Sequence, residues 1–249
     1  MSATEPLAIS GDDDGDFRCW ELPSGKRRRK IQAHDGGINA IALSPDGKYA
    51  ATGGDDGLIR LWNLDTGRDL ELEYSDWSDH DEEPIYLSFS RDGTKILAGG
   101  SGGRVAMWSV KTRERLKRYA GLDLPISCVR LSDEGGTVTA TTHPIQGGAA
   151  SYFVLSHWDR KTAEPMTRFN VAVASVPCCV TPDRNGKRVI VAGARVMPWM
   201  AVFSLESGRC LYEYQKLRGT PLCLAVAPRN NRLLASLGDR LQVFTMESI

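Results

Sequence analysis

The chain has 249 residues, of which 41% are hydrophobic and 25% are charged, and its 31 basic residues balance 31 acidic ones. This length accommodates one or two domains, and the composition is that of an ordinary soluble globular protein. A formal net charge of zero excludes a chain-wide field that would steer the protein to nucleic acid or an anionic membrane.

The sequence also predicts the cellular compartment of the protein. No apolar run approaches the roughly 18 residues of a membrane span, and the N-terminal residues MSATEPLAIS lack the basic start and apolar core of a secretory signal. Six cysteines without Cys-x-x-Cys spacing favour buried free thiols in a reducing compartment, so we expect a cytoplasmic protein. These are Cys19, Cys128, Cys178, Cys179, Cys210 and Cys223.

The first predicted strands lie in residues 2–34, where the segment SGDDDGDFRCW ends at Trp20. Its acidic run, Asp12 to Asp16, lacks the glycine at position six and the glutamate at position twelve of a calcium-binding EF-hand loop. We therefore interpret it as a turn. The basic run Lys26 to Lys30 falls where an outer strand belongs, and charged residues there deter edge aggregation.

The clearest predicted module is the segment from Ala33 to Gly67. Ile38, Ile41 and Leu43 mark a strand that ends at a Ser-Pro-Asp-Gly turn, and a second short strand ends at Gly53. Residues 58–62 form a third strand, and residues 68–74 alternate apolar and charged side chains, as an outer strand with one wet face does. Four such strands make a small sheet that needs neighbours of the same kind to cover its faces.

Weaker copies of this module recur along the chain. The aromatic residue that ends the third strand repeats at intervals that cluster in the forties, which is the period of propeller blades. The positions are Trp20, Trp62, Trp108, Trp158, Phe203 and Phe244. We expect one all-β domain over residues 1–249, a propeller of about six four-stranded antiparallel blades. The expected blades are 2–34, 35–75, 76–121, 122–170, 171–216 and 217–249.

On these motifs the chain resembles the WD-repeat β-propeller family, most completely over residues 33–67. The resemblance implies a buried hydrogen-bond relay through His34, Thr52, Asp56 and Trp62, in which each polar group satisfies the next. Ala33 stands where the family has glycine and Asn63 where it has aspartate. In the other copies the relay is incomplete, so we expect residues 35–75 to form the most stable blade.

The first and last blades are expected to be incomplete. The first lacks its innermost strand and the last its outer one, so we expect either a further N-terminal segment that completes the ring or pairing of an open edge with a second copy. An edge-to-edge homodimer is thus one alternative.

Family geometry places several candidate partner-binding residues on one rim of the ring. Trp77 and the loop residues Met197 and Trp199 are candidate anchors, because exposed Trp and Met on loops commonly anchor partners; packing of Trp199 and Met200 into the core is the alternative. The innermost strands add Asn39, Ile85, Ser127, Val176 and Leu222. Of these, Ile85, Val176 and Leu222 would form an apolar arc that suits a protein partner.

These observations favour a non-enzymatic interaction scaffold that binds a protein or peptide partner through one rim. The four histidines form no metal cluster, no catalytic or phosphate-binding motif occurs, and we expect no cofactor. Nucleic-acid binding is disfavoured, because the basic runs at Lys26–Lys30 and Lys111–Arg118 lie on outer strands. The alternatives are a propeller enzyme or ligand sensor with a site in the central channel, and a regulatory module of a larger protein.

Overall fold

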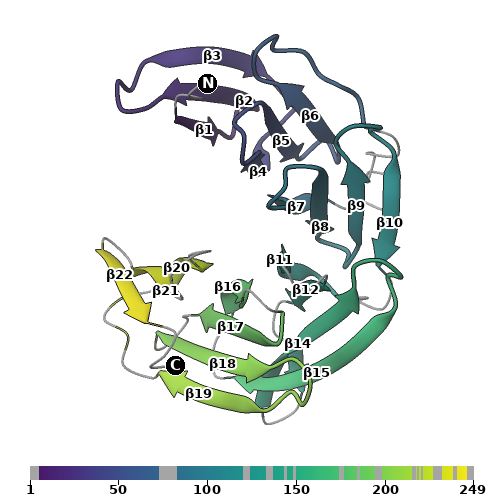
Figure 1. Ribbon diagram of the computed structural model, residues 1–249, viewed down its shortest axis with the longest axis vertical. Helices are drawn as coiled ribbons and strands as arrows, with labels where there is room; N and C mark the ends of the chain where they lie inside the picture. Colours follow the sequence, from purple (N-terminus) through teal and green to yellow (C-terminus); the bar gives the residue numbers. More distant parts are fainter. Residues whose placement is uncertain are drawn as a thin grey trace. The chain divides into compact units, whose positions relative to one another are not determined.

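The computed structural model describes residues 6–72, 83–119, 124–132, 137–142, 145–147, 150–173, 177–183, 186–193, 198–214, 217, 219, 221–226, 232–237 and 240–245. Within these ranges all regular structure is β, arranged in six antiparallel sheets (Figure 1). No helix in this part of the chain is long and apolar enough to cross a membrane. The chain divides into two compact units, Met1–Arg118 and Tyr119–Ile249.

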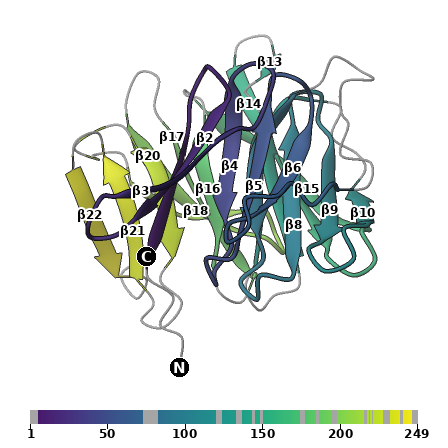
Figure 2. The same cartoon turned by 90° about the horizontal axis from the view of Figure 1, so that it is seen from above.

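The first unit contains three sheets, whose strands run side by side in Figure 2. The first sheet has the order β1-β2-β3, the second β4-β5-β6 and the third β7-β8-β9-β10. Their bounds are β1 (Leu7–Gly11), β2 (Asp16–Glu21), β3 (Arg27–Gln32), β4 (Ile38–Leu43), β5 (Tyr49–Gly54), β6 (Ile59–Asn63), β7 (Pro84–Phe89), β8 (Lys95–Gly100), β9 (Val105–Ser109) and β10 (Arg115–Tyr119).

Two apolar clusters join these sheets in series. Phe17 and Cys19 of β2 pack with Trp62 of β6, and the rings of Phe17 and Trp62 stack with centroids 6.5 Å apart. On the opposite face of the second sheet, Leu61 packs with Trp108 of β9. Because side chains alternate between the faces of a strand, Leu61 and Trp62 serve different neighbours.

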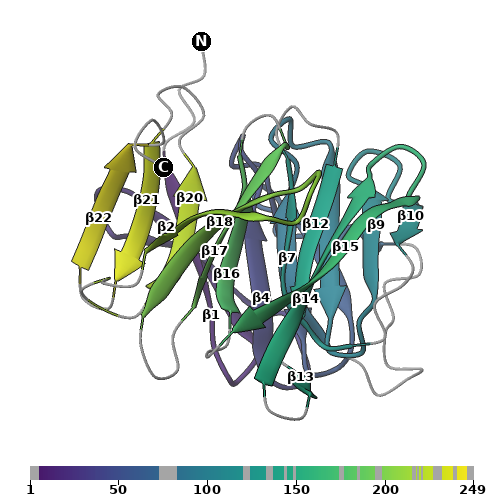
Figure 3. The ribbon, with the colours of Figure 1, turned by 90° about the horizontal axis from the view of Figure 1, so that it is seen from below.

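The second unit also contains three sheets. They have the orders β11-β12-β14-β13 with β15 paired to β14, β16-β17-β18-β19 and β20-β21-β22 (Figure 3). Their bounds are β11 (Ile126–Leu131), β12 (Thr137–Thr142), β13 (Ile145–Gly147), β14 (Ala150–Asp159), β15 (Pro165–Val173), β16 (Pro177–Pro182), β17 (Arg188–Gly193), β18 (Trp199–Ser204), β19 (Cys210–Tyr214), β20 (Pro221–Val226), β21 (Arg232–Leu237) and β22 (Arg240–Thr245). Met200 and Val202 of β18 pack with Leu233 and Ala235 of β21.

Of the predicted outer strand at residues 68–74, residues 73 and 74 lie outside the described residues. Residues 68–72 form no named strand, so the described second sheet has three strands, but a bridge joins Asp69 to Trp62 and the Leu70 N–H donates to the Leu61 carbonyl at 2.7 Å. Asp69 binds Arg60 through one carboxylate oxygen at 3.3 Å and accepts the backbone N–H of Glu71 through the other at 2.9 Å. Glu71 has a φ of 47°, which turns the backbone away from an extended course.

Two segments of the second unit differ from their expected loops. The loop predicted from His143 to Ala150 contains β13, in which Ile145 lies opposite Tyr152 of β14. The loop predicted around Trp199 gives way to β18, which begins at that residue, opposite Gly193 of β17. Strand β15 also continues past the expected blade boundary at residue 170, because it pairs with β14 as far as Val173.

Candidate functional site: the relay and the rim of the second sheet

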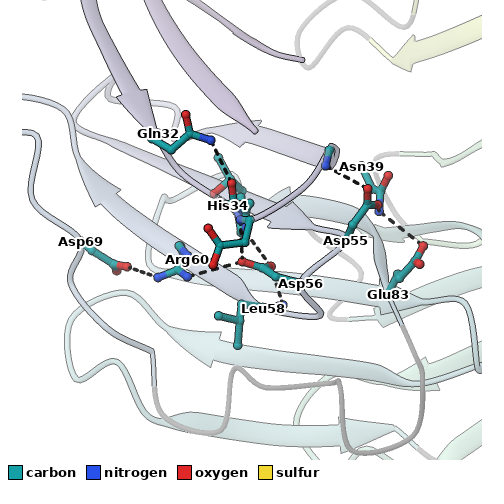
Figure 4. A network of polar contacts seen from close by, with 12 residues as sticks. Gln32, His34, Asn39, Asp55, Asp56, Leu58, Arg60, Asp69 and Glu83 are labelled. Atoms are coloured by element: carbon teal, nitrogen blue, oxygen red, sulfur yellow. Dashed lines mark hydrogen bonds and ion pairs between the residues drawn. The ribbon is translucent and has the colours of Figure 1, made fainter. Parts of the chain in front are cut away.

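The four relay residues come together inside the second sheet. His34 follows β3, Thr52 lies in β5, Asp56 lies in the turn after β5, and Trp62 lies in β6. The Nε1–H of Trp62 donates to Thr52 Oγ1 at 2.9 Å, and Thr52 Oγ1 lies 2.7 Å from His34 Nε2. His34 Nδ1 lies 2.8 Å from Asp56 Oδ1 (Figure 4).

Donor counting fixes the direction of this relay. The Asp56 carboxylate only accepts, so His34 carries its proton on Nδ1, and its Nε2 accepts the single proton of the Thr52 hydroxyl. Burial lowers the pKa of His34, although Asp56 opposes the shift. Burial alone would raise the pKa of Asp56, but the hydrogen bonds from His34 and the backbone of Leu58 bring it below its usual value. The relay therefore holds a neutral histidine against an ionised aspartate.

The neighbouring turn residue, Asp55, organises an exposed rim. Its Oδ1 accepts the amide N–H of Asn39 at 2.7 Å, and its Oδ2 accepts the backbone N–H of Gly37 at 2.9 Å. Asn39 Nδ2 also reaches Glu83 Oε2 at 3.5 Å, at the start of the third sheet (Figure 4). The Glu83 backbone N–H donates to Ser101 Oγ at 2.9 Å. Asn39, Asp55 and Glu83 are all exposed, so this network links two sheets at the surface.

Most of the other predicted partner-binding residues do not have side chains that the structure describes. Trp77, Val176 and Met197 lie outside the described residues, and for Ile85 and Leu222 the structure describes only the backbone, in β7 and β20. The side chains of the apolar arc are therefore outside the described part of the chain. Ser127 is half-buried, and its hydroxyl lies 2.8 Å from Thr141 Oγ1 within its own sheet.

Trp199 is not the exposed loop anchor that the sequence predicts. Its ring is half-buried and stacks on Phe153 of β14 with centroids 6.3 Å apart, and the next residue, Met200, is fully buried. Its Nε1 is buried without a hydrogen-bond partner. The alternative prediction, that Trp199 and Met200 pack into the core, therefore holds for Met200, and the half-buried ring of Trp199 agrees with it in part.

The acidic turn at residues 12–16 carries ion pairs. Asp12 contacts Arg18, and Asp16 pairs with Lys30 at 2.6 Å and with Arg18 at 3.0 Å. Among the described residues, no group of three or more His, Cys, Asp and Glu side chains is placed to hold a metal ion. Three of the described cysteines are buried, but Cys210 is exposed, which differs from the expectation for that residue.

Sequence reasoning did not identify Asp55 as a rim residue, nor His157 as a buried histidine. Asp55 precedes the relay aspartate, so the paired acids of the turn offered a signal: one faces inward and the other outward. His157 occupies a core position of β14, is 4% exposed, and has its Nδ1 3.3 Å from Thr167 Oγ1. Burial lowers its pKa.

Comparison with known proteins gives a family match for one part of the chain. The model of the WD domain, G-beta repeat, matches residues 25–63, which comprise all of β3, β4, β5 and β6. Over these residues the chain is similar to the WD-repeat family. The matched repeat takes its first strand, β3, from the first sheet and the other three from the second, so this repeat joins these two sheets.

Two curated relatives align with short parts of this chain. The small ribosomal subunit protein RACK1y of Oryza sativa subsp. japonica is 43% identical over 47 residues, which are 19% of this chain and 14% of that protein. The guanine nucleotide-exchange factor SEC12 of Rattus norvegicus is 43% identical over 42 residues, 17% of this chain and 10% of that protein. The chain thus covers less than a sixth of either relative.

A solved structure shares the fold along almost the whole chain. A chain of Kuenenia stuttgartiensis hydrazine synthase matches with a TM-score of 0.76 and 14% identity, covering 99% of this chain and 78% of that chain. At this identity the likeness concerns the fold alone. The predicted fold class, an all-β propeller of antiparallel blades, is confirmed. WD-repeat proteins commonly act as interaction scaffolds and are generally not enzymes.

The relay makes a stability prediction. Replacing His34 with Ala leaves Thr52 and Asp56 buried without their partner, so the free energy of unfolding should fall by about 1–3 kcal/mol. Trp62→Phe removes the donor to Thr52 together with part of the buried ring that stacks on Phe17, so it too should lower the free energy of unfolding, by about 1–3 kcal/mol. Urea denaturation followed by fluorescence and circular dichroism measures both. An unchanged stability in His34→Ala would contradict the relay.

The two buried histidines also predict how stability depends on pH. Burial lowers the folded-state pKa of His34 and of His157, so the unfolded chain takes up protons first as the pH falls below about 6.5. Stability is therefore complete above that pH and is lost below it, by up to about 1.4 kcal/mol per pH unit for each histidine until the folded pKa is reached.

Urea titrations at pH 7, 6 and 5 measure this loss, and the variant His157→Gln should show a shallower slope than the wild type. Carboxylate titration belongs to a lower window, around pH 4 and below, and does not interfere. A slope unaffected by His157→Gln would show that this histidine is not buried in its neutral form.

Proposed function

We propose that this protein is a non-enzymatic, cytoplasmic interaction platform that binds a protein partner on the rim carrying Asn39, Asp55 and Glu83. The observation that carries the proposal is the exposed network of these three side chains. It joins the second and third sheets; Asp55 accepts the backbone N–H of Gly37, and the backbone N–H of Glu83 donates to Ser101 Oγ. A rigid surface loses little conformational entropy when it binds, which favours affinity.

The charge of this rim favours a basic partner. The exposed carboxylates on its turns are Asp13, Asp14, Asp35, Asp55 and Glu83. Backbone hydrogen bonds hold the first turns together: Ile38 donates to Asp12 at 3.0 Å, and Asp55 donates to Gly37 at 3.0 Å. Electrostatic complementarity would speed association with a Lys- or Arg-rich segment and make the binding salt-dependent.

The relatives support a role in assemblies of proteins. One is named as a protein of the small ribosomal subunit and the other as a guanine nucleotide-exchange factor. By analogy, we propose binding rather than catalysis for this chain. Trp77 and Met197 stay candidate contacts on the same rim, together with the apolar arc of Ile85, Val176 and Leu222.

The variant Glu83→Lys tests this rim, because it reverses a charge whose side chain makes, among the described residues, a single 3.5 Å contact with Asn39. Glu114→Lys is the matched control: Glu114 is equally exposed and lies in the turn between β9 and β10, at the opposite end of its sheet from Glu83. Immobilised wild type, Glu83→Lys and Glu114→Lys are used to capture partners from cell extract, and the principal captured protein is then titrated against each.

We expect Glu83→Lys to weaken binding about tenfold, which is about 1.4 kcal/mol, and to reduce its salt dependence. Glu114→Lys should bind like the wild type. Equal affinity of all three proteins, or a loss confined to Glu114→Lys, would contradict the proposed rim.

A further inference from the structure

The outer strand of the first sheet carries a row of positive charges. Strand β3 has the sequence RRRKIQ and follows Lys26 directly, so the residues from Lys26 to Lys30 are all cationic. Charge on an outer strand keeps it from pairing with other strands, but two outer strands of the second unit lack such charge. Strand β15 has one charged residue in PMTRFNVAV and β19 has one in CLYEY. Protection of the edge alone therefore does not account for five consecutive cations.

The protein neutralises only part of this charge. Arg28 pairs with Asp65 at 3.0 Å, and Lys30 pairs with Asp16 at 2.6 Å. The other three cations of the row have no carboxylate partner in the part of the chain that the structure describes; they are Lys26, Arg27 and Arg29. Lys26 and Arg27 are exposed, so their charges are available to a ligand.

The backbone of β3 is also unpaired along one side. Among the described strands β3 pairs with β2 alone, and it forms the outer side of its sheet (Figure 1). The Ala33 N–H donates to the Gly15 carbonyl at 2.9 Å, and these two residues flank the opposed residues Asp16 and Gln32. Asp16 and Gln32 are therefore a non-hydrogen-bonded pair, and because the two kinds of pair alternate, Lys30 belongs to another. The N–H and C=O groups of Lys30 and Gln32 point to the free edge.

An extended acidic segment fits both features of this edge. The unpaired backbone groups of an edge strand can bind another extended chain by strand addition. The cations select acidic side chains and reject basic ones. Strand β3 has no aromatic residue on which a nucleic-acid base could stack, which disfavours single-stranded RNA or DNA.

The far end of β3 limits where the acidic side chains of such a ligand can lie. Gln32 Nε2 donates to the Asp14 carbonyl at 2.7 Å, so this end of the strand adjoins the acidic turn. The carboxylates of that turn repel acidic side chains. The acidic residues of a ligand therefore belong against Lys26–Lys30, and its neutral residues against Gln32.

We propose that the free edge of β3 binds an extended acidic segment of a partner protein as an additional strand of the first sheet. Backbone hydrogen bonds at Lys30 and Gln32 hold the main chain of the segment, and the row of cations binds its Asp and Glu side chains. The edge shares no residue with the rim of Asn39, Asp55 and Glu83, whose charge has the opposite sign. Either proposal can therefore fail while the other holds.

Titration of the isotope-labelled full chain with defined ligands, followed by nuclear magnetic resonance, tests this proposal. The main probe is a heptapeptide of alternating glutamate and valine with blocked ends. One comparison peptide has lysine in place of glutamate. Another keeps the glutamates but is methylated at every backbone nitrogen, which preserves its charge and removes the N–H donors that strand addition uses. Poly(U) RNA represents a polyanion that cannot add as a strand.

The variant Lys26→Glu/Arg27→Glu reverses the two exposed cations without removing a described contact. The matched control is Lys161→Glu/Arg209→Glu, which makes the same change in net charge at two exposed cations of the second unit. Lys161 lies between β14 and β15, and Arg209 lies between β18 and β19. Circular dichroism and melting temperature establish that both variants fold.

We expect the glutamate peptide to bind the wild type and the control equally, and to shift the amide signals of Lys30 and Gln32. Its binding to Lys26→Glu/Arg27→Glu should be at least about tenfold weaker, as should the binding of either comparison peptide to the wild type. No binding of the glutamate peptide to the wild type, or equal binding to the β3 variant, would overturn the proposal. So would equally tight binding of the methylated peptide, or tighter binding of poly(U) at the same amides.

Discussion

The structure depends on the packing of one sheet face against the next, because a sheet of three or four strands has two faces and cannot bury either alone. Phe17 stacks on Trp62 in one junction, and Leu61 packs with Trp108 in the next. Neighbouring positions of one strand thus serve two different junctions. This arrangement explains why an aromatic residue repeats at the end of each third strand. It also explains why the residues beside it are apolar.

The relay adds a polar tie to this apolar packing. It runs from the core, at Trp62, through Thr52 and His34 to Asp56 in a surface turn. The residue before Asp56 holds Asn39 and the backbone of Gly37 on the rim. The turn that completes the relay therefore also fixes the exposed network, and rigidity of the core is transmitted to the proposed docking surface.

The sequence was sufficient to predict features that depend on residues within a single repeat. The third strands with their aromatic residues, the tight turns and the positions of His34 and Asp56 follow from patterns within a few residues. Contacts between sheets could not be predicted from the sequence in the same way. The sequence alone suggests that Trp199 is an exposed loop residue, but in the structure its ring stacks on Phe153, which is distant in the sequence. The link from Asn39 to Glu83 likewise requires knowledge of which turns meet at one rim.

Native-state hydrogen exchange with residue resolution tests most directly whether junctions between sheets, together with the relay, determine stability. Amides of β5 and β6 lie in the sheet that has neighbours in its own unit on both faces and contains the relay, so they should exchange slowest. Within the second unit, the sheet of β21 and β22 packs on the sheet of β17 and β18, and the amides of β21 and β22 should exchange faster than those of β5 and β6. Uniform protection across the sheets, or stronger protection in β22 than in β6, would contradict this account.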